Sequence, residues 1–280
     1  MANDLSLSKY FNNNTPLIMG ILNVTPDSFS DGEQYLSIEL AISRAKEIIA
    51  EGGDIIDIGG ESSRPGSEPV SLDDEIERVI PVIKAIRTFS MIPISIDTTK
   101  SEVANLAIKS GADIINDISA LRLDEKMIDV AIEFNAPVIL MHMLGKPKTM
   151  QVEPHYDDCV TEVMQFLSER VQYCENKGVS KEKIIIDPGI GFGKRLIDNL
   201  AIIKNISIFK KLGCPILIGT SRKSFIGMVT GNMKNSDKRI GGSIASSIYA
   251  MLKGVDILRV HDVAATVEAV KVIKSIERGE

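Results

Sequence analysis

Short apolar runs alternate with longer amphipathic stretches along almost the whole chain. The runs are rich in Ile, Val and Leu, are too short for helices, and end on polar or glycine residues. Runs of this kind, separated by stretches with helical spacing, are typical of buried parallel strands joined by crossover helices. The eight runs are Leu17–Asn23, Asp54–Gly60, Pro93–Asp97, Ile114–Asp117, Pro137–His142, Ile184–Asp187, Pro215–Gly219 and Asp256–His261.

Eight strand–helix repeats predict an α/β fold, a single (β/α)8 TIM barrel with its active site at the C-terminal ends of the strands. A polar insertion, Gly231–Lys238, precedes the seventh helix. We find no linker and expect a short extension at residues 1–16 and one barrel domain at 17–280. The helices are expected at Ile38–Glu51, from Ser71 as N-cap to Thr88, from Lys100 onward, and at Asp124–Phe134, Tyr156–Lys177, Asn199–Leu212, Gly242–Leu252 and Val263–Ile276.

Composition narrows the class of ligand. The formal net charge of −6 argues against a nucleic-acid partner, whereas local basic clusters on an acidic protein suit a small anionic ligand. Three scattered cysteines form no Cys-x-x-Cys motif and fit a reducing compartment. The polar N-terminus predicts no signal peptide and no run is long enough for a membrane span, so we expect a cytoplasmic protein without a membrane partner.

Basic side chains follow the last two predicted strands. Arg259 and His261 are two residues apart on a strand, so they point to the same side and could clamp an oxyanion. A salt bridge to a neighbouring Asp is the alternative for this pair. Lys223 and Ser224, next to Arg222, could hold a carboxylate or phosphate at the start of a helical turn, although a solvated basic turn explains them equally well.

Acidic and amide side chains end other strands. Asp97, Asn116 and Asp187 could pair with the polar edges of a flat heterocycle, or could simply hold the barrel together. Asn23 could bind Mg²⁺ together with phosphate oxygens, or make a structural hydrogen bond. The side chains of Met141, Phe192 and His142 could either contact a ligand or pack in the core. For His142 we favour core packing.

Longer motifs identify the chain as similar to the dihydropteroate synthase family. The first and the seventh-strand motifs are highly specific, and the match spans nearly the whole chain. The matching segments are Ile18–Gly32 (IMGILNVTPDSFSDG), Gly59–Gly66 (GGESSRPG), Ser95–Thr98 (SIDT), Ile115–Asp117 (IND), Asp187–Lys194 (DPGIGFGK), Gly219–Gly227 (GTSRKSFIG) and Arg259–Asp262 (RVHD).

The resemblance implies a transferase of folate biosynthesis. It would condense 6-hydroxymethyl-7,8-dihydropterin pyrophosphate with p-aminobenzoate to 7,8-dihydropteroate and pyrophosphate, with Mg²⁺ as cofactor and sulfonamides as inhibitors. The implied pterin-binding residues are Asp97, Asn116, Met141, Asp187, Lys223 and Arg259. The implied p-aminobenzoate pocket is Phe29, Ser63, Pro65, Phe192, Lys223 and Ser224. Pyrophosphate would be held by Asn23, which also binds the metal, and by Arg259 and His261. The catalytic set is Asp31, Arg64, Lys223, Arg259 and His261.

The resemblance also implies a homodimer formed through the later helices. Two positions depart from the common pattern: Ser63 stands where Thr is usual, and Glu33 where a second Gly is common. Because the p-aminobenzoate amine is unprotonated at neutral pH, we expect a dissociative displacement whose barrier is the departure of pyrophosphate. The rival functions are a pterin-dependent methyltransferase on the same barrel and a non-catalytic pterin-binding protein. A phosphate-barrel lyase would need a lysine inside a strand, and no predicted strand contains one.

Overall fold

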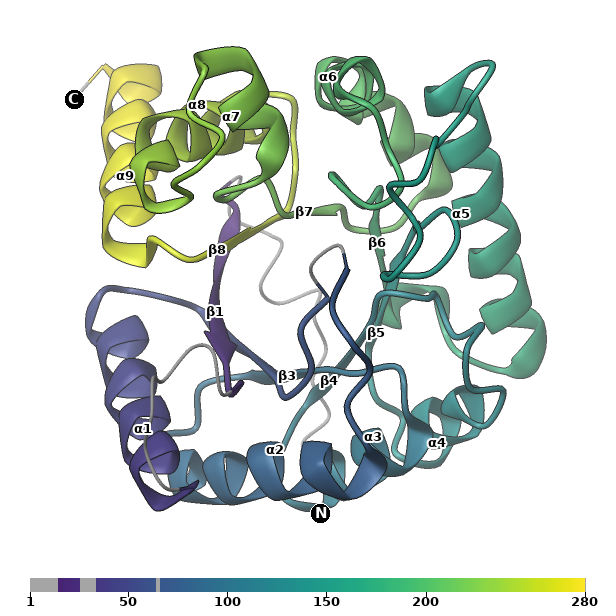
Figure 1. The fold of residues 1–280 in the computed structure, drawn as a ribbon, viewed down its shortest axis with the longest axis vertical. Coiled ribbons are helices and arrows are strands. Elements are labelled where there is room, and N and C mark those ends of the chain that lie inside the picture. The colour runs from purple at the N-terminus through teal and green to yellow at the C-terminus, as the bar shows by residue number, and fades with distance from the viewer. Residues whose placement is uncertain (1–14, 26–33, 64–65, 280) are drawn as a thin grey trace.

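Eight parallel strands surround a common axis, and helices return along the outside (Figure 1). The structure is a computed structural model and describes residues 15–25, 34–63 and 66–279. The strands pair in the order β6-β5-β4-β3-β2-β1-β8-β7, and a parallel bridge from Ile186 to Ile216 joins the two ends of the sheet. The strands are β1 Leu17–Asn23, β2 Ile55–Gly59, β3 Ile94–Asp97, β4 Ile114–Asp117, β5 Val138–Met141, β6 Ile184–Asp187, β7 Leu217–Ile218 and β8 Ile257–Val260.

The predicted (β/α)8 barrel is therefore confirmed, with helices close to the expected positions. None of the helices in the described ranges is long and apolar enough to cross a membrane. The helices are α1 Gln34–Ala50, α2 Leu72–Arg87, α3 Ser101–Lys109, α4 Met127–Glu133, α5 Cys159–Lys177, α6 Leu196–Lys204, α7 Ser224–Thr230, α8 Ile240–Leu252 and α9 Val263–Arg278, with 3₁₀ segments η4 Lys181–Lys183, η5 Ile206–Leu212 and η6 Asp237–Arg239.

Several boundaries differ from the prediction for local reasons. The expected helix Asn199–Leu212 is two segments, because Asn205 ends α6 and its side-chain amide donates to Ala201 O at 2.9 Å. Helix α4 begins three residues late, because the carboxylate of Asp124 accepts from Ser101 N at 2.8 Å and caps α3 instead. Strand β7 is only two residues long, and the basic residues Arg222 and Lys223 form a turn that leads into the short helix α7.

The barrel interior is layered. An apolar cluster fills its amino-terminal end; its members are Leu17, Met19, Ile55, Ile114, Ile139, Ile185, Leu217 and Ile257. Because side chains alternate along a strand, the residues two positions further on face the axis one layer higher. That second layer contains Asp57, Asn116, Met141, Asp187 and Arg259. The strand pattern thus places a layer of mostly polar side chains, the polar layer, at the carboxyl end of the barrel. The apolar cluster below it forms an apolar plug.

Candidate active site

Arg259 lies at the centre of the polar layer. Its Nε donates to Asp57 Oδ2 at 2.6 Å and its Nη2 to Asp97 Oδ2 at 2.7 Å. The salt bridge that was the alternative for Arg259 is thus present, and it comes from two carboxylates rather than one. Burial opposes the charged guanidinium, but Asp57 and Asp97 outweigh burial and raise the pKa of Arg259. Arg259 therefore stays cationic within the polar layer.

Asp57 is a site residue that the sequence analysis missed. It is fully buried in β2, and Asn116 donates to its two carboxylate oxygens at 3.2 and 3.3 Å. The signal was available, because Asp57 is the one charged residue in the run Ile55–Gly59 and faces inward in register with Ser95. An isolated carboxylate in a buried strand needs a partner, and here Arg259 supplies it.

Two predicted carboxylates carry raised pKa values. Burial raises the pKa of Asp97 to about 7, with Asp57 adding to the shift and Arg259 opposing it. Burial also raises the pKa of Asp187, opposed by the Gly189 amide, Lys223 and Arg259. Gly189 N donates to Asp187 Oδ1 at 2.7 Å. Arg259 is the charged group that acts on both carboxyl groups, and each can accept hydrogen bonds from a polar ligand.

Lys223 connects the polar layer to an apolar wall. Its ammonium lies 4.1 Å from the centroid of the Phe192 ring. Its positive charge also opposes the rise in the pKa of Asp187. A Cβ on Gly191 would lie 3.2 Å from Lys223 Cδ, and Gly191 has φ +84°, so glycine is needed there for both space and conformation. The wall itself is a cluster of buried side chains: Ile118, Met141, Met143, Met150 and Phe192. The predicted ring contacts Met141 and Phe192 therefore share one surface.

A buried lysine supports the loop that follows β6. Lys194 is 3% exposed and donates to His142 Nδ1 at 2.8 Å, to Gly189 O at 2.9 Å and to Phe192 O at 3.1 Å. Burial lowers the pKa of Lys194 to about 7, and burial followed by Lys194 lowers that of His142 to about 2. His142 is thus the satisfied core imidazole that the sequence favoured, and Lys194 was part of a motif without an assigned role.

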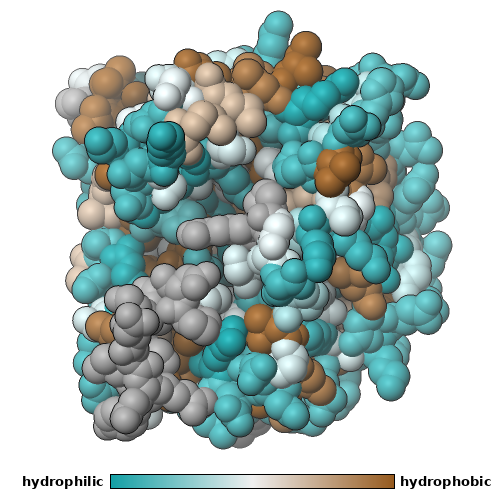
Figure 2. Space-filling model, in the orientation of Figure 1, coloured by the Kyte–Doolittle hydropathy of each residue, from teal (hydrophilic) through white to brown (hydrophobic). Residues whose placement is uncertain are grey.

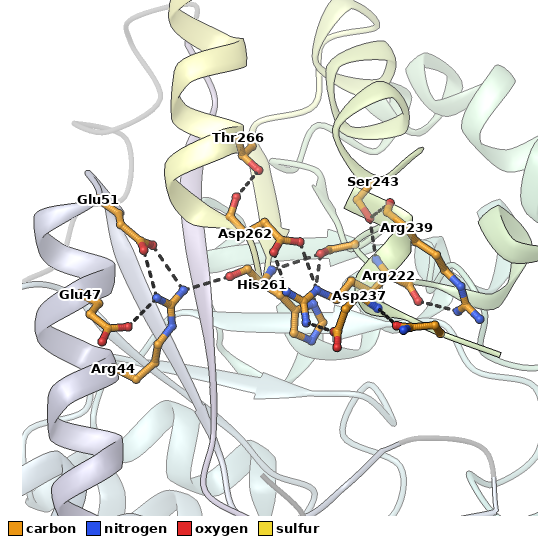
Figure 3. Close-up of polar contacts among 12 residues, drawn as sticks. Arg44, Glu47, Glu51, Arg222, Asp237, Arg239, Ser243, His261, Asp262 and Thr266 are labelled. Carbon is orange, nitrogen blue, oxygen red and sulfur yellow. Dashed lines mark hydrogen bonds and ion pairs between the residues drawn. The ribbon is translucent and has the colours of Figure 1, made fainter. Parts of the chain in front are cut away.

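His261 lies just beyond β8 and is held on both sides (Figure 3). Its backbone N–H donates to Ser221 Oγ at 3.2 Å, its Nδ1 lies 3.1 Å from the same oxygen, and its carbonyl accepts from Arg44 Nη2 at 3.0 Å. Burial, then the charges of Arg259, Arg222 and Lys223, lower the pKa of His261 to about 3. The ring is therefore neutral at physiological pH, and could meet an anion as an N–H donor.

The remaining predicted residues lie around this centre or outside the described residues. A Cβ on Gly59 would lie 3.8 Å from Asn23 Oδ1 and 3.5 Å from Asp97 Cβ, so Asn23 and Asp97 flank the same strand end. Ser224 begins α7, directly after Lys223. Ser63 is half-buried in the loop after β2. Phe29, Asp31, Arg64 and Pro65 lie outside the described residues, as does Glu33.

The base of the loop that carries Ser63 is nevertheless fixed. The ammonium of Lys100 forms ion pairs with Glu61 and, at 2.5 Å, with Glu75. Arg78 Nη1 donates to Gly60 O at 2.8 Å. These contacts tie the end of β2 to α2 and to the start of α3, which holds the root of the loop beside the polar layer.

No cluster of three or more His, Cys, Asp or Glu side chains among the described residues could hold a metal on its own. The donor available at the predicted position is the amide oxygen of Asn23, a neutral ligand. Mg²⁺ is commonly bound by one or two protein oxygens together with substrate phosphates and water. The residues present therefore fit a metal that binds with a phosphorylated substrate, and do not form a preassembled cage.

Known proteins share both the sequence and the fold of this chain. The family described as pterin binding enzyme matches residues 19–261. A dihydropteroate synthase from Synechocystis sp. is 47% identical over 261 residues, covering 93% of this chain and 90% of the relative. The structure of Xanthomonas albilineans dihydropteroate synthase with 4-aminobenzoic acid is 44% identical, covers 94% of this chain and 93% of its own, and has a TM-score of 0.89. The same enzyme in complex with 7,8-dihydropteroate is 41% identical with a TM-score of 0.85, covering 94% of each chain. The chain belongs to the pterin-binding enzyme family and, within it, to the dihydropteroate synthases.

Proposed function

We propose that this chain condenses 6-hydroxymethyl-7,8-dihydropterin pyrophosphate with p-aminobenzoate, giving 7,8-dihydropteroate and pyrophosphate, through the residues of the polar layer. The observation that carries the proposal is the contact of Arg259 with both Asp57 and Asp97, one layer above an apolar plug. A desolvated guanidinium flanked by carboxylates offers fixed donors and acceptors to a flat polar ring, and can stabilise negative charge that develops nearby.

The pterin ring occupies the slot between the polar layer and the apolar wall. Asp97 and Asp187 accept hydrogen bonds from its N–H groups, and Asn116 serves as donor or acceptor at its edge. Met141, 3% exposed and part of the wall, supplies an apolar face. Positive charge that spreads into the pterin as the leaving group departs is stabilised by the same two carboxylates.

The p-aminobenzoate ring binds beside Lys223 and Phe192. The Lys223 ammonium already lies 4.1 Å from the Phe192 ring centroid, so a planar carboxylate-bearing ring finds an apolar surface and a cation together. Ser224 and Ser63 are the hydroxyl groups assigned to the same pocket. Sulfonamides, which resemble p-aminobenzoate in shape and charge, are expected to compete for it.

The pyrophosphate group is held by Arg259 and His261. The two carboxylate contacts of Arg259 use Nε and Nη2, so its Nη1 is the nitrogen we assign to a phosphate oxygen. The Ser221 hydroxyl accepts from His261 N–H and can donate to Nδ1, which would place the ring proton on Nε2. A neutral imidazole with its Nε2–H directed at the anion stabilises the leaving group without first having to gain a proton.

Mg²⁺ is proposed as the cofactor, held by Asn23 together with the substrate phosphates. When bound, it supplies positive charge to the departing pyrophosphate. Asp31 and Arg64, which the resemblance places in the catalytic set, remain predictions because they lie outside the described residues.

A pyrophosphate-release assay tests the proposal. Purified protein with both substrates and Mg²⁺ is expected to release pyrophosphate in step with dihydropteroate, and neither substrate alone should give net release. Exchange of isotope between bridging and non-bridging oxygens of the pyrophosphate ester, without p-aminobenzoate, would support the dissociative route. Binding of pterin without turnover would instead indicate a non-catalytic pterin-binding protein.

We further propose that two copies of the chain associate through a late-helix patch, defined as Ile197, Leu200, Met228, Val229, Ile240, Tyr249 and Leu252. These side chains are 40 to 68% exposed on α6, α7 and α8, and α6 contacts both of the other helices. Figure 2 shows hydrophobic side chains gathered along the upper edge of the molecule, where Figure 1 places these helices. The cytoplasm is the proposed compartment, since all three cysteines are buried free thiols.

A further inference from the structure

The loops that follow β7 and β8 are joined by an ion pair that the proposed chemistry does not use. Arg222 Nε donates to Asp262 Oδ2 at 3.1 Å, and Arg222 Nη2 donates to Asp262 Oδ1 at 2.6 Å (Figure 3). The two side chains are 29% and 14% exposed. A bidentate pair fixes both the separation and the relative orientation of its two groups. Each partner is the immediate chain neighbour of a proposed site residue, Lys223 in one loop and His261 in the other.

The main chain of Arg222 is fixed as firmly as its side chain. Its N–H donates to Ser243 Oγ at 2.8 Å and its carbonyl accepts from Arg239 Nη1 at 2.9 Å. Its Nη1 also donates to Asp237 at 2.7 Å. Arg222 has φ +59°, a conformation that a residue with a side chain rarely adopts unless its surroundings impose it. The surroundings here are α8 and the polar insertion, both of which hold the loop in one shape.

Ser221, next to Arg222, also joins the two loops. Ser221 Oγ accepts from His261 N–H and contacts His261 Nδ1. Ser221 thus binds His261 and Arg222 binds Asp262, so two successive residues of each loop are joined. On the opposite side, Arg44 of α1 donates to the His261 carbonyl and is itself paired with Glu51 at 3.1 Å. In Figure 3 His261 lies between these two arginines.

We propose that Arg222 and Asp262 are positioning residues, which fix the p-aminobenzoate side of the site relative to the pyrophosphate side. This inference rests on the proposed function. In a displacement at the pterin methylene carbon, the C–O bond to pyrophosphate breaks with its electron pair leaving on oxygen, and the amine nitrogen forms the new C–N bond and then loses a proton to solvent. The bond that breaks and the bond that forms share one carbon, so the groups that hold the amine and the leaving group must keep a fixed spacing.

The spacing depends on the ion pair because the two subsites belong to different loops. Lys223 and Ser224 follow β7, and His261 follows β8, and the two strands pair over only two residues, Leu217 with Ile257 and Ile218 with Leu258. Beyond that short ladder, the contacts of Ser221 and Arg222 hold the loops together. An error of about 1 Å in such an alignment can cost about a hundredfold in rate.

The test uses D262N and R222K, with D113N and R87K as matched controls. Arg87 and Asp113 form a pair of the same residue types at 2.6 Å, 16% and 14% exposed, at the amino end of the barrel. Lysine at 222 keeps the charge but cannot form the bidentate contact. For each protein we would measure Tm, kcat, KM for p-aminobenzoate, and binding of inorganic pyrophosphate and of p-aminobenzoate by calorimetry.

We expect D262N and R222K to lower kcat/KM for p-aminobenzoate about tenfold to a hundredfold, through kcat and KM together. Their Tm should fall no further than that of D113N and R87K, whose kinetics should match the wild type. The charge-swapped protein R222D/D262R should regain part of the loss, and it keeps the proposal testable if one single variant does not fold.

Wild-type kinetics in D262N and R222K would overturn the proposal. So would equal kinetic losses in all four single variants, because the pair would then be structural only. Wild-type protein that released no pyrophosphate would overturn the proposed function instead. In that case the two calorimetric affinities would still show whether breaking the pair disturbs either subsite.

Discussion

Replacement of Lys194 by Met is expected to change how the stability of the protein depends on pH. The wild-type ammonium is buried and donates to His142 Nδ1 and to three backbone carbonyls, Gly189 O, Phe192 O and, at 3.4 Å, His142 O. Methionine fills similar space but neither donates nor titrates. The variant therefore removes one buried charge and the three N–H donors of the ammonium, with little change in packing volume.

The two consequences nearly cancel at neutral pH. Loss of three net hydrogen bonds costs about 3 kcal/mol, at about 1 kcal/mol each. The fall of the Lys194 pKa from 10.5 to about 7 means that the folded protein disfavours the charged lysine by about 5 kcal/mol. At pH 7 the wild-type protein still carries most of this cost, and the variant does not. We expect the two proteins to differ by less than about 2 kcal/mol at pH 7.

The sign of the pH dependence follows from proton counting. Between pH 7 and 10.5 the unfolded chain holds the Lys194 proton and the folded protein has largely released it, so raising the pH favours the folded state. Wild-type stability should gain about 1 to 2 kcal/mol from this residue between pH 7 and pH 8.5, and K194M should not. Higher pH is avoided because burial raises the pKa of Cys174 and Cys214 to about 11, which acts in the opposite direction.

Urea unfolding at pH 7.0, 7.5, 8.0 and 8.5 measures this difference. Far-ultraviolet circular dichroism is the suitable signal, since the chain contains no tryptophan. K183M is the matched control, because Lys183 is also largely buried and donates to a backbone carbonyl, Asn135 O, at 2.7 Å. Parallel pH profiles for K194M and wild type would refute the reasoning. A profile flattened equally in K183M would show that the effect is not specific to Lys194.

Three further predictions concern the site and the assembly. Asp57→Ala should lower the free energy of unfolding by about 3–5 kcal/mol in urea and abolish turnover, because Arg259 and Asn116 lose a buried acceptor; a stable, active variant would contradict the Arg259 assignment. EDTA should abolish pyrophosphate release, and Mg²⁺ should restore it. Asn23→Ala should raise the Mg²⁺ concentration needed for half-maximal release at least about tenfold. Full turnover in EDTA would exclude the proposed cofactor. Val229→Asp, at a 61% exposed position of α7, should convert a dimer to a monomer in analytical ultracentrifugation. The control Val152→Asp, at a 74% exposed position outside the patch, should not. A dimer that persists in Val229→Asp would place the interface elsewhere.

The order of strands and helices was set by local pattern. Apolar runs such as Leu17–Asn23 and Ile184–Asp187 were predicted with the boundaries that the structure has, because buried parallel strands need continuous apolar sequence. The Ser71 cap was also read correctly, since its Oγ accepts from Asp74 N at 3.1 Å. The predicted helix boundaries were wrong where a single side-chain hydrogen bond ended a helix, as at Asn205 within the predicted sixth helix.

The sequence by itself determined that Asp97, Asp187, Lys223 and Arg259 would meet at one end of a barrel, because parallel strands carry their carboxyl ends to the same face. Only the tertiary structure decided which of them touch. Asp57 looked like one residue in an apolar run until Arg259, 202 positions away, was found to donate to it. Ion pairs between distant strands depend on register and on burial, and neither quantity is a property of a local segment of chain.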